Sequence, residues 1–265
     1  MKKIILYLII SLSFLTLNAA GQNSSLQIIT GNGKAGFKDG KDAELNKPIR
    51  LAPYKNNSVV FADINNHAVR IVTLEGEVTT IAGGPDKKGY RDGLFSEAEF
   101  NSPHGVAYDS VNDIIYVAEA GANLIRTITK NKEGEFVVST LAGIPNEKGF
   151  KDGKSDSALF NSPHTVILRK EGGVYVVDIG NSRVRQIKDE VVSTVAGSGK
   201  SGSDDGKYDE ASFVYAIDIV SDGTNIFVAD AGSNLIRKVL PYKTVETVKL
   251  NDTLNTPHEI GRAHV

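Results

Sequence analysis

Four stretches of the sequence repeat one string, in which an acid follows two apolar residues and an arginine comes seven residues after the acid. The stretches are FADINNHAVRI (Phe61–Ile71), VAEAGANLIRT (Val117–Thr127), VVDIGNSRVRQ (Val176–Gln186) and VADAGSNLIRK (Val228–Lys238). Their arginines are separated by 56, 59 and 52 residues. A period of this length indicates stacked structural units rather than one irregular domain.

The same companion segments recur around each string. An Asn-x-Pro comes before it, as in FNSPHGVA and FNSPHTVI, and a strand such as VTTIAGG or VSTLAGI comes after it. A glycine-rich loop then ends in Asp-Gly; these dipeptides are Asp39-Gly40, Asp92-Gly93, Asp152-Gly153 and Asp205-Gly206. Short β-branched runs such as SVVFAD and IIYVAE read as strands, and no window after the first twenty residues has a helical stripe. The pattern predicts an all-β chain, a β-propeller of four-stranded antiparallel blades starting near Asn46, Asn101, Asn161 and Val214.

The combination A-D-x-x-N-H/N-x-I/V-R, T-I/L/V-A-G, G-F/Y-x-D-G and N-x-P-x-G-V-A resembles the NHL repeat family, in particular its secreted bacterial members. The resemblance covers residues 26–258, which we predict to be one propeller domain. Four complete blades and the start of a fifth, at Asn255–His258, are visible. Rings that this one resembles have six blades, so the resemblance implies a chain truncated at its C-terminus.

The two ends of the sequence break the pattern. LQIITG (Leu26–Gly31) matches the outermost strand of a blade, but the other strands of a blade do not precede it. In closed rings such a leading strand completes the last blade. Glu259–Val265 abandons the repeat and resembles the translation of a sequencing-library adapter, so we interpret residues 259–265 as a non-native tail.

The first twenty residues have the three parts of a signal peptide. Lys2 and Lys3 precede a 14-residue apolar run, and small residues follow it at Ala19 and Ala20. The run is shorter than the about 20 residues of a membrane span. We therefore predict a secreted protein of the periplasm, cell surface or cell exterior, with no membrane span once residues 1–20 are removed.

Composition excludes several function classes. The chain has no cysteine, which rules out disulfides, a thiol nucleophile and cysteine-bound zinc. Without Lys2 and Lys3 it carries 28 basic and 32 acidic residues, a net charge of −4, which disfavours nucleic acid as a partner. GSGKSG (Gly197–Gly202) contains Gly-Lys-Ser, but Thr194 stands where a phosphate loop needs its first glycine, and no helix follows.

The acid and arginine of the string recur in every blade, whereas a catalytic group is needed once. We therefore interpret them as structural, the acid bonding turns and the arginine pairing strands. The pairs are Asp63 with Arg70, Glu119 with Arg126, Asp178 with Arg185 and Asp230 with Arg237.

Two further sets of side chains are candidates for binding. The Asp-Gly loops carry aromatics at Phe37, Tyr90 and Phe150, which either form a receiving ring for a polymer or simply pin their own loops; the second reading is favoured. His104, His164 and His258 share one position, after the proline of N-S/T-P-H, at the start of the strand that lines a propeller channel. They predict an axial ligand site or a divalent metal site, unless the repeat merely shares a strand cap. Ile49 and Ile217 fill this position in the first and fourth blades.

Two function classes remain open. The first is a non-catalytic scaffold whose faces bind a protein, peptide or glycan, with no cofactor. The second is a propeller enzyme, a lyase or hydrolase with an axial metal or ligand, as in relatives by fold. The sequence has no unique acid pair, no G-x-S-x-G and no cysteine, so we assign no catalytic residue and favour the scaffold.

Overall fold

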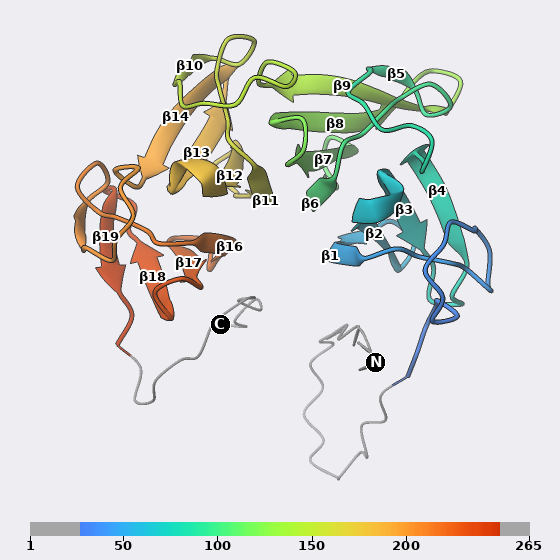
Figure 1. Cartoon of the computed structure of the whole chain (residues 1–265), viewed down its shortest axis with the longest axis horizontal. Coiled ribbons are helices and arrows are strands. Elements are labelled where there is room, and N and C mark those ends of the chain that lie inside the picture. Colours follow the sequence, from blue (N-terminus) through green and yellow to red (C-terminus); the bar gives the residue numbers. More distant parts are fainter. Residues whose placement is uncertain (1–26, 250–265) are drawn as a thin grey trace.

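The computed structural model describes residues 27–249 and consists of four antiparallel sheets arranged as blades around a common axis (Figure 1). The strands β1, β6, β11 and β16 lie nearest the axis, and the sheets fan outward from them (Figure 1). This confirms the predicted all-β propeller. Within the described range no helix is long and apolar enough to cross a membrane.

Each blade is a four-stranded meander that runs from the axis to the rim. Blade 1 contains β1 (Pro48–Tyr54), β2 (Ser58–Asp63), β3 (Ala68–Val72) and β4 (Val78–Gly83). Blade 2 contains β6 (Pro103–Asp109), β7 (Ile114–Glu119), β8 (Leu124–Lys130) and β9 (Phe136–Ala142). Blade 3 contains β11 (Pro163–Leu168), β12 (Val174–Asp178), β13 (Arg183–Lys188) and β14 (Val191–Ala196). Blade 4 contains β16 (Ala216–Ser221), β17 (Ile226–Asp230), β18 (Leu235–Val239) and β19 (Thr244–Thr247).

Three blades have a fifth, two-residue strand that the repeat pattern did not predict. These strands are β5 (Gly93–Leu94), β10 (Gly153–Lys154) and β15 (Gly206–Lys207). Each lies at the Asp-Gly loop and pairs with the outermost strand of its own blade, β9, β14 or β19. In blade 1 the equivalent contact is a single bridge between Gly40 and Val78. The loop thereby covers the rim edge of the sheet, which would otherwise expose unpaired backbone groups.

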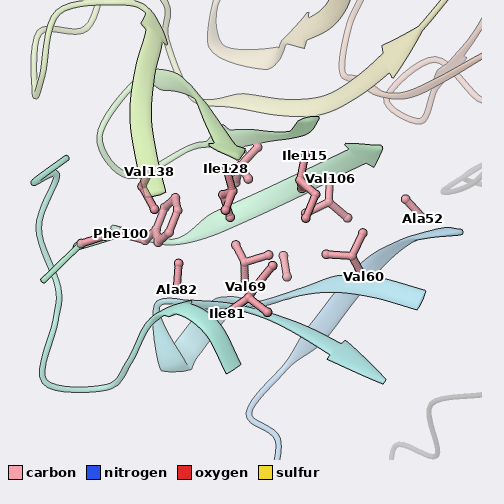
Figure 2. Packing of buried hydrophobic residues seen from close by; sticks show 13 residues of the cluster. Ala52, Val60, Val69, Ile81, Ala82, Phe100, Val106, Ile115, Ile128 and Val138 are labelled. Atoms are coloured by element: carbon pink, nitrogen blue, oxygen red, sulfur yellow. The ribbon is translucent and has the colours of Figure 1, made fainter. Parts of the chain in front are cut away.

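The hydrophobic core lies between blades rather than within them. Between blades 1 and 2, Val69 and Ile81 face Phe100, Ile128 and Val138 (Figure 2). The β-branched residues of the strands supply most of this surface because they fit a pleated sheet buried on one face. Helical structure in the described residues is limited to two single turns, η1 (Ile64–Asn66) and η2 (Ile179–Asn181).

The segment before blade 1 contacts that blade without forming a strand in the described residues 27–31. Ile29 packs against the cluster that contains Phe61 and Val78. Ile29 stands in its segment where Ile81 stands in VTTIAG, and Ile81 contacts the equivalent core of blade 2. Ile29 thus packs on blade 1 at the position where a residue of the preceding blade's outermost strand packs on blade 2. The described residues do not test the pairing of residues 26–31 with a last blade, which stays a prediction. The segments at 255–258 and 259–265 lie outside the described range, so the calls on them stay predictions too.

Candidate functional site

A fully buried arginine lies at the same place in every blade, held between two acids. In blade 2, Nη1 of Arg126 is 2.7 Å from Oε2 of Glu119, and Nη2 is 2.6 Å from Oδ1 of Asp92. Arg126 also donates to the backbone carbonyls of Arg91 and Glu99. Blades 1 and 3 repeat this arrangement with Arg70 and Arg185. A guanidinium buried without such partners would be strongly destabilising, so the cluster is a matched unit.

The acid of the repeated string connects two strands of its blade. Oε1 of Glu119 accepts a hydrogen bond from the backbone N–H of Asn101, just before the axial strand, while its other oxygen binds Arg126. Asp63 and Asp178 accept equivalent bonds from Asn46 and Asn161. The start of each axial strand is therefore fixed to the end of the second strand, which is consistent with a structural role for the acid and the arginine.

The second acid of each cluster comes from the Asp-Gly loop, and sequence reasoning missed this role. Asp92 binds Arg126 and also accepts hydrogen bonds from the backbone N–H and the hydroxyl of Thr140 on β9. The same pattern occurs at Asp39 with Thr80 and at Asp152 with Thr194. The signal was present, because an Asp-Gly before the arginine and a strand threonine after it recur in every blade, although the spacing varies by a few residues.

Blade 4 departs from the other three. Nη1 of Arg237 is 3.8 Å from Oδ2 of Asp230, whereas the matching distances in blades 1 to 3 are 2.7–2.8 Å. Asp230 instead accepts hydrogen bonds from the backbone N–H groups of Val214 and Tyr215. Blade 4 is also the copy whose Asn-x-Pro is replaced by Val-Tyr-Ala.

Burial acts against ionisation of two of these acids. It raises the pKa of Glu119 to about 7 although Arg126 favours the charged form. Burial likewise raises the pKa of Asp178 to about 6, opposed by hydrogen bonds from Asn161 and Asn181 and by Arg185. In both cases the loss of water outweighs the bound partners.

Two of the three predicted histidines meet at the axis. The ring centroids of His104 and His164 are 4.5 Å apart, with the ring planes tilted by 50°. Each histidine occupies a bulge directly after the first residue of its axial strand, β6 or β11. Gly105 permits this close approach, because a Cβ there would lie 2.5 Å from the carbonyl oxygen of His164. His258 lies outside the described residues.

Both imidazoles are held in the neutral form. Burial, helped by the neighbouring His104 and Arg50, lowers the pKa of His164 to about 3. Burial also lowers the pKa of His104, against a hydrogen bond to the carbonyl of Ser102. Nδ1 of His104 lies 3.0 Å from that oxygen, and since a carbonyl only accepts, Nδ1 carries the proton and Nε2 the lone pair. Nδ1 of His164 is buried with no hydrogen-bond partner in residues 27–249.

An ion pair beside the histidines joins the first and fourth blades, which sequence reasoning also missed. Nη1 of Arg50 on β1 is 2.8 Å from Oδ2 of Asp218 on β16, and both side chains are largely buried. Nη2 of Arg50 donates to the carbonyl of Ile217. In β1 the bulge falls at Arg50 rather than at Ile49, and Arg50 takes a left-handed φ of 48°. Because of this shift by one residue, the bulge of blade 1 holds Arg50 and not Ile49, the residue that matches His104 in the sequence repeat.

The predicted metal site is incomplete in the described residues. His104 and His164 supply two nitrogen donors, but residues 27–249 contain no group of three histidine or acid side chains that could hold a metal ion. Protein zinc sites use at least three protein ligands. The remaining candidate, His258, lies outside the described range, so the metal stays a prediction.

Phe37 and Phe150 pack against arginines near their loops, and all three loop aromatics are partly exposed. The ring of Phe37 lies 5.0 Å from the guanidinium carbon of Arg70. Phe150 lies 3.7 Å from that of Arg183 and 4.9 Å from that of Arg185. Phe37, Tyr90 and Phe150 are 38–46 % exposed. The packing of Phe37 and Phe150 agrees with aromatics that pin their own loops, while the exposed fraction leaves ring surface for a ligand.

Comparison with known proteins gives the family. No protein-family model matches the chain. It is 31 % identical over 239 residues to "NHL repeat-containing protein 2" of Bos taurus, covering 78 % of this chain and 32 % of that protein. The chain is an NHL-repeat β-propeller. The match spans about a third of the length of this curated relative.

Solved structures share the fold of this NHL propeller at low sequence identity. One is an auxiliary nutrient binding protein from Bacteroides ovatus, with a TM-score of 0.60 and 19 % identity over 78 % of this chain and 50 % of that one. Another is virginiamycin B lyase from Staphylococcus aureus, with a TM-score of 0.51 and 15 % identity over 82 % of this chain and 61 % of that one. One fold therefore serves both binding and catalysis in these neighbours.

Proposed function

We propose that this NHL propeller is a secreted, non-catalytic scaffold that binds a protein, peptide or glycan. The observation that carries the proposal is a contrast at the axial strands. The strand starts are fixed by the same acid-to-backbone bond, yet the fourth residue after each repeat's opening Asn46, Asn101, Asn161 or Val214 differs in every blade. These residues are Arg50, which lies in the bulge of β1, and Gly105, Thr165 and Asp218, which directly follow the bulges of β6, β11 and β16. A constant frame whose axial residues vary from blade to blade, here buried or half-buried groups that set the shape and charge of the axis, is what a recognition scaffold needs.

The repeated charged groups support binding over catalysis because they already have partners. Glu119 accepts from Asn101 and Arg126, and Asp92 accepts from Arg126 and Thr140. A general acid or base must be able to reach a substrate, and a nucleophile must be exposed to one. The buried acid and arginine of each cluster cannot reach a substrate and are not exposed to one.

The comparisons and the N-terminal sequence add support of a weaker kind. The structural neighbour from Bacteroides ovatus is named a nutrient binding protein, which agrees with a binding role. The basic and apolar pattern of residues 1–20 supports export to the periplasm, cell surface or exterior.

The second candidate is a propeller enzyme that uses the axial site, a lyase or hydrolase as the sequence left open. The observation that favours it is the pair of neutral imidazoles at His104 and His164, since metal binding requires unprotonated nitrogen. A metal held there with a third donor would act as a Lewis acid. The residues of this chain would contribute by holding Nε2 of His104 unprotonated and by excluding water from the bulge.

The test is a screen of the purified chain on glycan and peptide arrays, followed by mass spectrometry of each recovered ligand. We expect saturable binding and a ligand of unchanged mass. Arg50→Gly, which removes the guanidinium and suits the left-handed φ at this residue, should weaken that binding at least tenfold.

A control variant removes a different ion pair of blade 1, one that is exposed and joins it to blade 2. Lys55→Ala breaks the exposed contact between Lys55 and Asp113 at the far end of β1, and binding should be unchanged. Conversion of the recovered ligand that is lost in His104→Ala would refute the scaffold and favour the enzyme. Equal binding by wild type and Arg50→Gly would show that the axial strand starts do not carry recognition.

A further inference from the structure

At the first two joints between blades, one residue of the repeated string holds the next blade. This residue is the fourth after the acid, and its φ is left-handed in every blade, at His67, Asn123, Ser182 and Asn234. Between blades 2 and 3, Oδ1 of Asn123 lies 2.9 Å from the backbone nitrogen of Ser162, directly before β11, and accepts its N–H. At the third joint the N–H of Tyr215 donates to Asp230 of its own blade. At the first two joints, a side chain of one blade therefore fixes the start of the axial strand in the next.

The joint between blades 1 and 2 uses a histidine for the same contact. Nδ1 of His67 lies 3.1 Å from the backbone nitrogen of Ser102, directly before β6, and accepts its N–H. Since Nδ1 accepts, the neutral imidazole carries its proton on Nε2. The amide oxygen of Asn123 accepts at every pH, whereas an imidazole that takes up a second proton can only donate. The first joint is therefore the titratable counterpart of the second.

Ser102 connects this joint to the axial histidines. Its carbonyl oxygen lies 3.0 Å from Nδ1 of His104 and accepts that N–H, and the ring of His104 lies 4.5 Å from the ring of His164. Ser102 itself has a left-handed φ of 53°, a conformation that a residue other than glycine keeps only where its surroundings fix it. The hydrogen bond from its N–H to His67 is one of the contacts that fix it. Loss of this bond would therefore loosen Ser102 and the residue that orients His104.

The surroundings of His67 favour its neutral form. Burial, helped by the charge of Lys88 on the loop after β4, lowers the pKa of His67 below its ordinary value of 6.5. The open joint thus binds a proton more tightly than the closed one, so the bond is fully present above pH 6.5 and is lost as the pH falls. One acid beside the joint titrates in the same range: Glu119 accepts from the N–H of Asn101, next to Ser102, and burial raises the pKa of Glu119 to about 7. A test of the joint must separate this acid from His67.

We propose that His67 is an acid-sensitive latch between the first two blades. At neutral pH its Nδ1 holds the N–H of Ser102 and thereby the start of β6. In acid the imidazole takes up a proton from water, Nδ1 becomes a donor, and the N–H of Ser102 loses its acceptor. The start of the strand then loosens next to His104, and a ligand bound there is released. Only this last consequence rests on the recognition function proposed above, because the latch itself needs no ligand.

The test is hydrogen exchange of single amides in the whole isotope-labelled chain, followed by nuclear magnetic resonance at pH 7.5 and pH 5. The quantity compared is the protection of the Ser102 N–H divided by that of the Ser162 N–H. Both amides lie in the same tetrapeptide, Asn-Ser-Pro-His, so the effects of pH on intrinsic exchange and on global unfolding cancel. We expect the ratio to fall at least about threefold at pH 5, because protonation of His67 favours the open joint.

The two acceptors provide matched variants, because asparagine and histidine both suit the left-handed φ of this position. In His67→Asn the ratio should be the same at both pH values, and in the double variant His67→Asn/Asn123→His it should rise in acid instead of falling. A ratio that does not change with pH in the wild type would overturn the latch.

An equal fall in wild type and His67→Asn would also overturn the latch and would assign the effect to Glu119, which every variant keeps. No ligand enters this measurement. The latch can therefore be refuted while the scaffold function stands, and the scaffold function can be refuted while the latch stands.

Discussion

The arginine clusters near the rim and the histidine pair at the axis are built from the same repeat in opposite ways. At the rim, Arg70, Arg126 and Arg185 make nearly the same contacts in each blade, and every charge meets an opposite charge. At the axis, His104 and His164 meet each other, and the fourth blade offers Ile217 instead. Repetition therefore indicates which charges support the frame, and departures from it indicate which positions are free to acquire a ligand.

The largest expected effect separates a buried cluster charge from an exposed one. Arg126→Leu leaves Glu119 and Asp92 without their cation, and a broken buried pair costs about 3–5 kcal/mol of unfolding free energy. Urea unfolding followed by circular dichroism measures the loss. Arg91→Ala is the control, because Arg91 is 64 % exposed and its pair with Glu99 should contribute less than about 1 kcal/mol. Similar losses in both variants would contradict the framework role of the cluster.

The next effect is the pH dependence of the axial histidines. Burial lowers the pKa of His164 to about 3 from an ordinary value of 6.5, so the unfolded chain takes up a proton that the folded chain does not. The stability contributed by neutral His164 is full above pH 6.5 and is lost as the pH falls. Between pH 7.5 and pH 5 the loss should be about 2 kcal/mol. Urea midpoints at the two pH values measure it.

The control for this pH effect is His164→Gln, which cannot take up the proton. Its stability should change less between pH 7.5 and pH 5 than that of the wild type, by about the same 2 kcal/mol. Burial raises the pKa of Glu119 to about 7, so this acid binds its proton more tightly in the folded chain and stabilises it as the pH falls. Both proteins share that opposing effect, and the difference between them isolates His164. An identical pH dependence in both would show that His164 does not titrate between these states as its burial implies.

The same contrast explains what the sequence could predict. The propeller and the strands of each blade followed from the period of the repeat. A structural role for Asp63 and Arg70 was predicted from their recurrence, but their ion pair with each other was not. The two-residue strand at Gly93–Leu94 did not follow from the repeat, because two residues show no alternation. The pair of Arg50 with Asp218 did not either, because each occurs once and their meeting depends on the curvature of the ring and on a bulge displaced by one residue.

The smallest expected effect tests whether the Asp-Gly loop is part of the frame or only covers it. Thr140→Val removes the hydroxyl that donates to Oδ1 of Asp92 but keeps the backbone N–H bond and the pair with Arg126. Since one hydrogen bond to an exposed, already paired carboxylate is lost, unfolding free energy should fall by about 1 kcal/mol. Ser139→Ala, one residue away on β9, has no such bond and should change stability by less than about 0.5 kcal/mol. A loss of several kcal/mol in Thr140→Val would show that the loop aspartate is held in place by β9 and that Arg126 depends on it. No loss at all would show that the buried acid Glu119 alone fixes the arginine, with the loop a cover that the frame can do without.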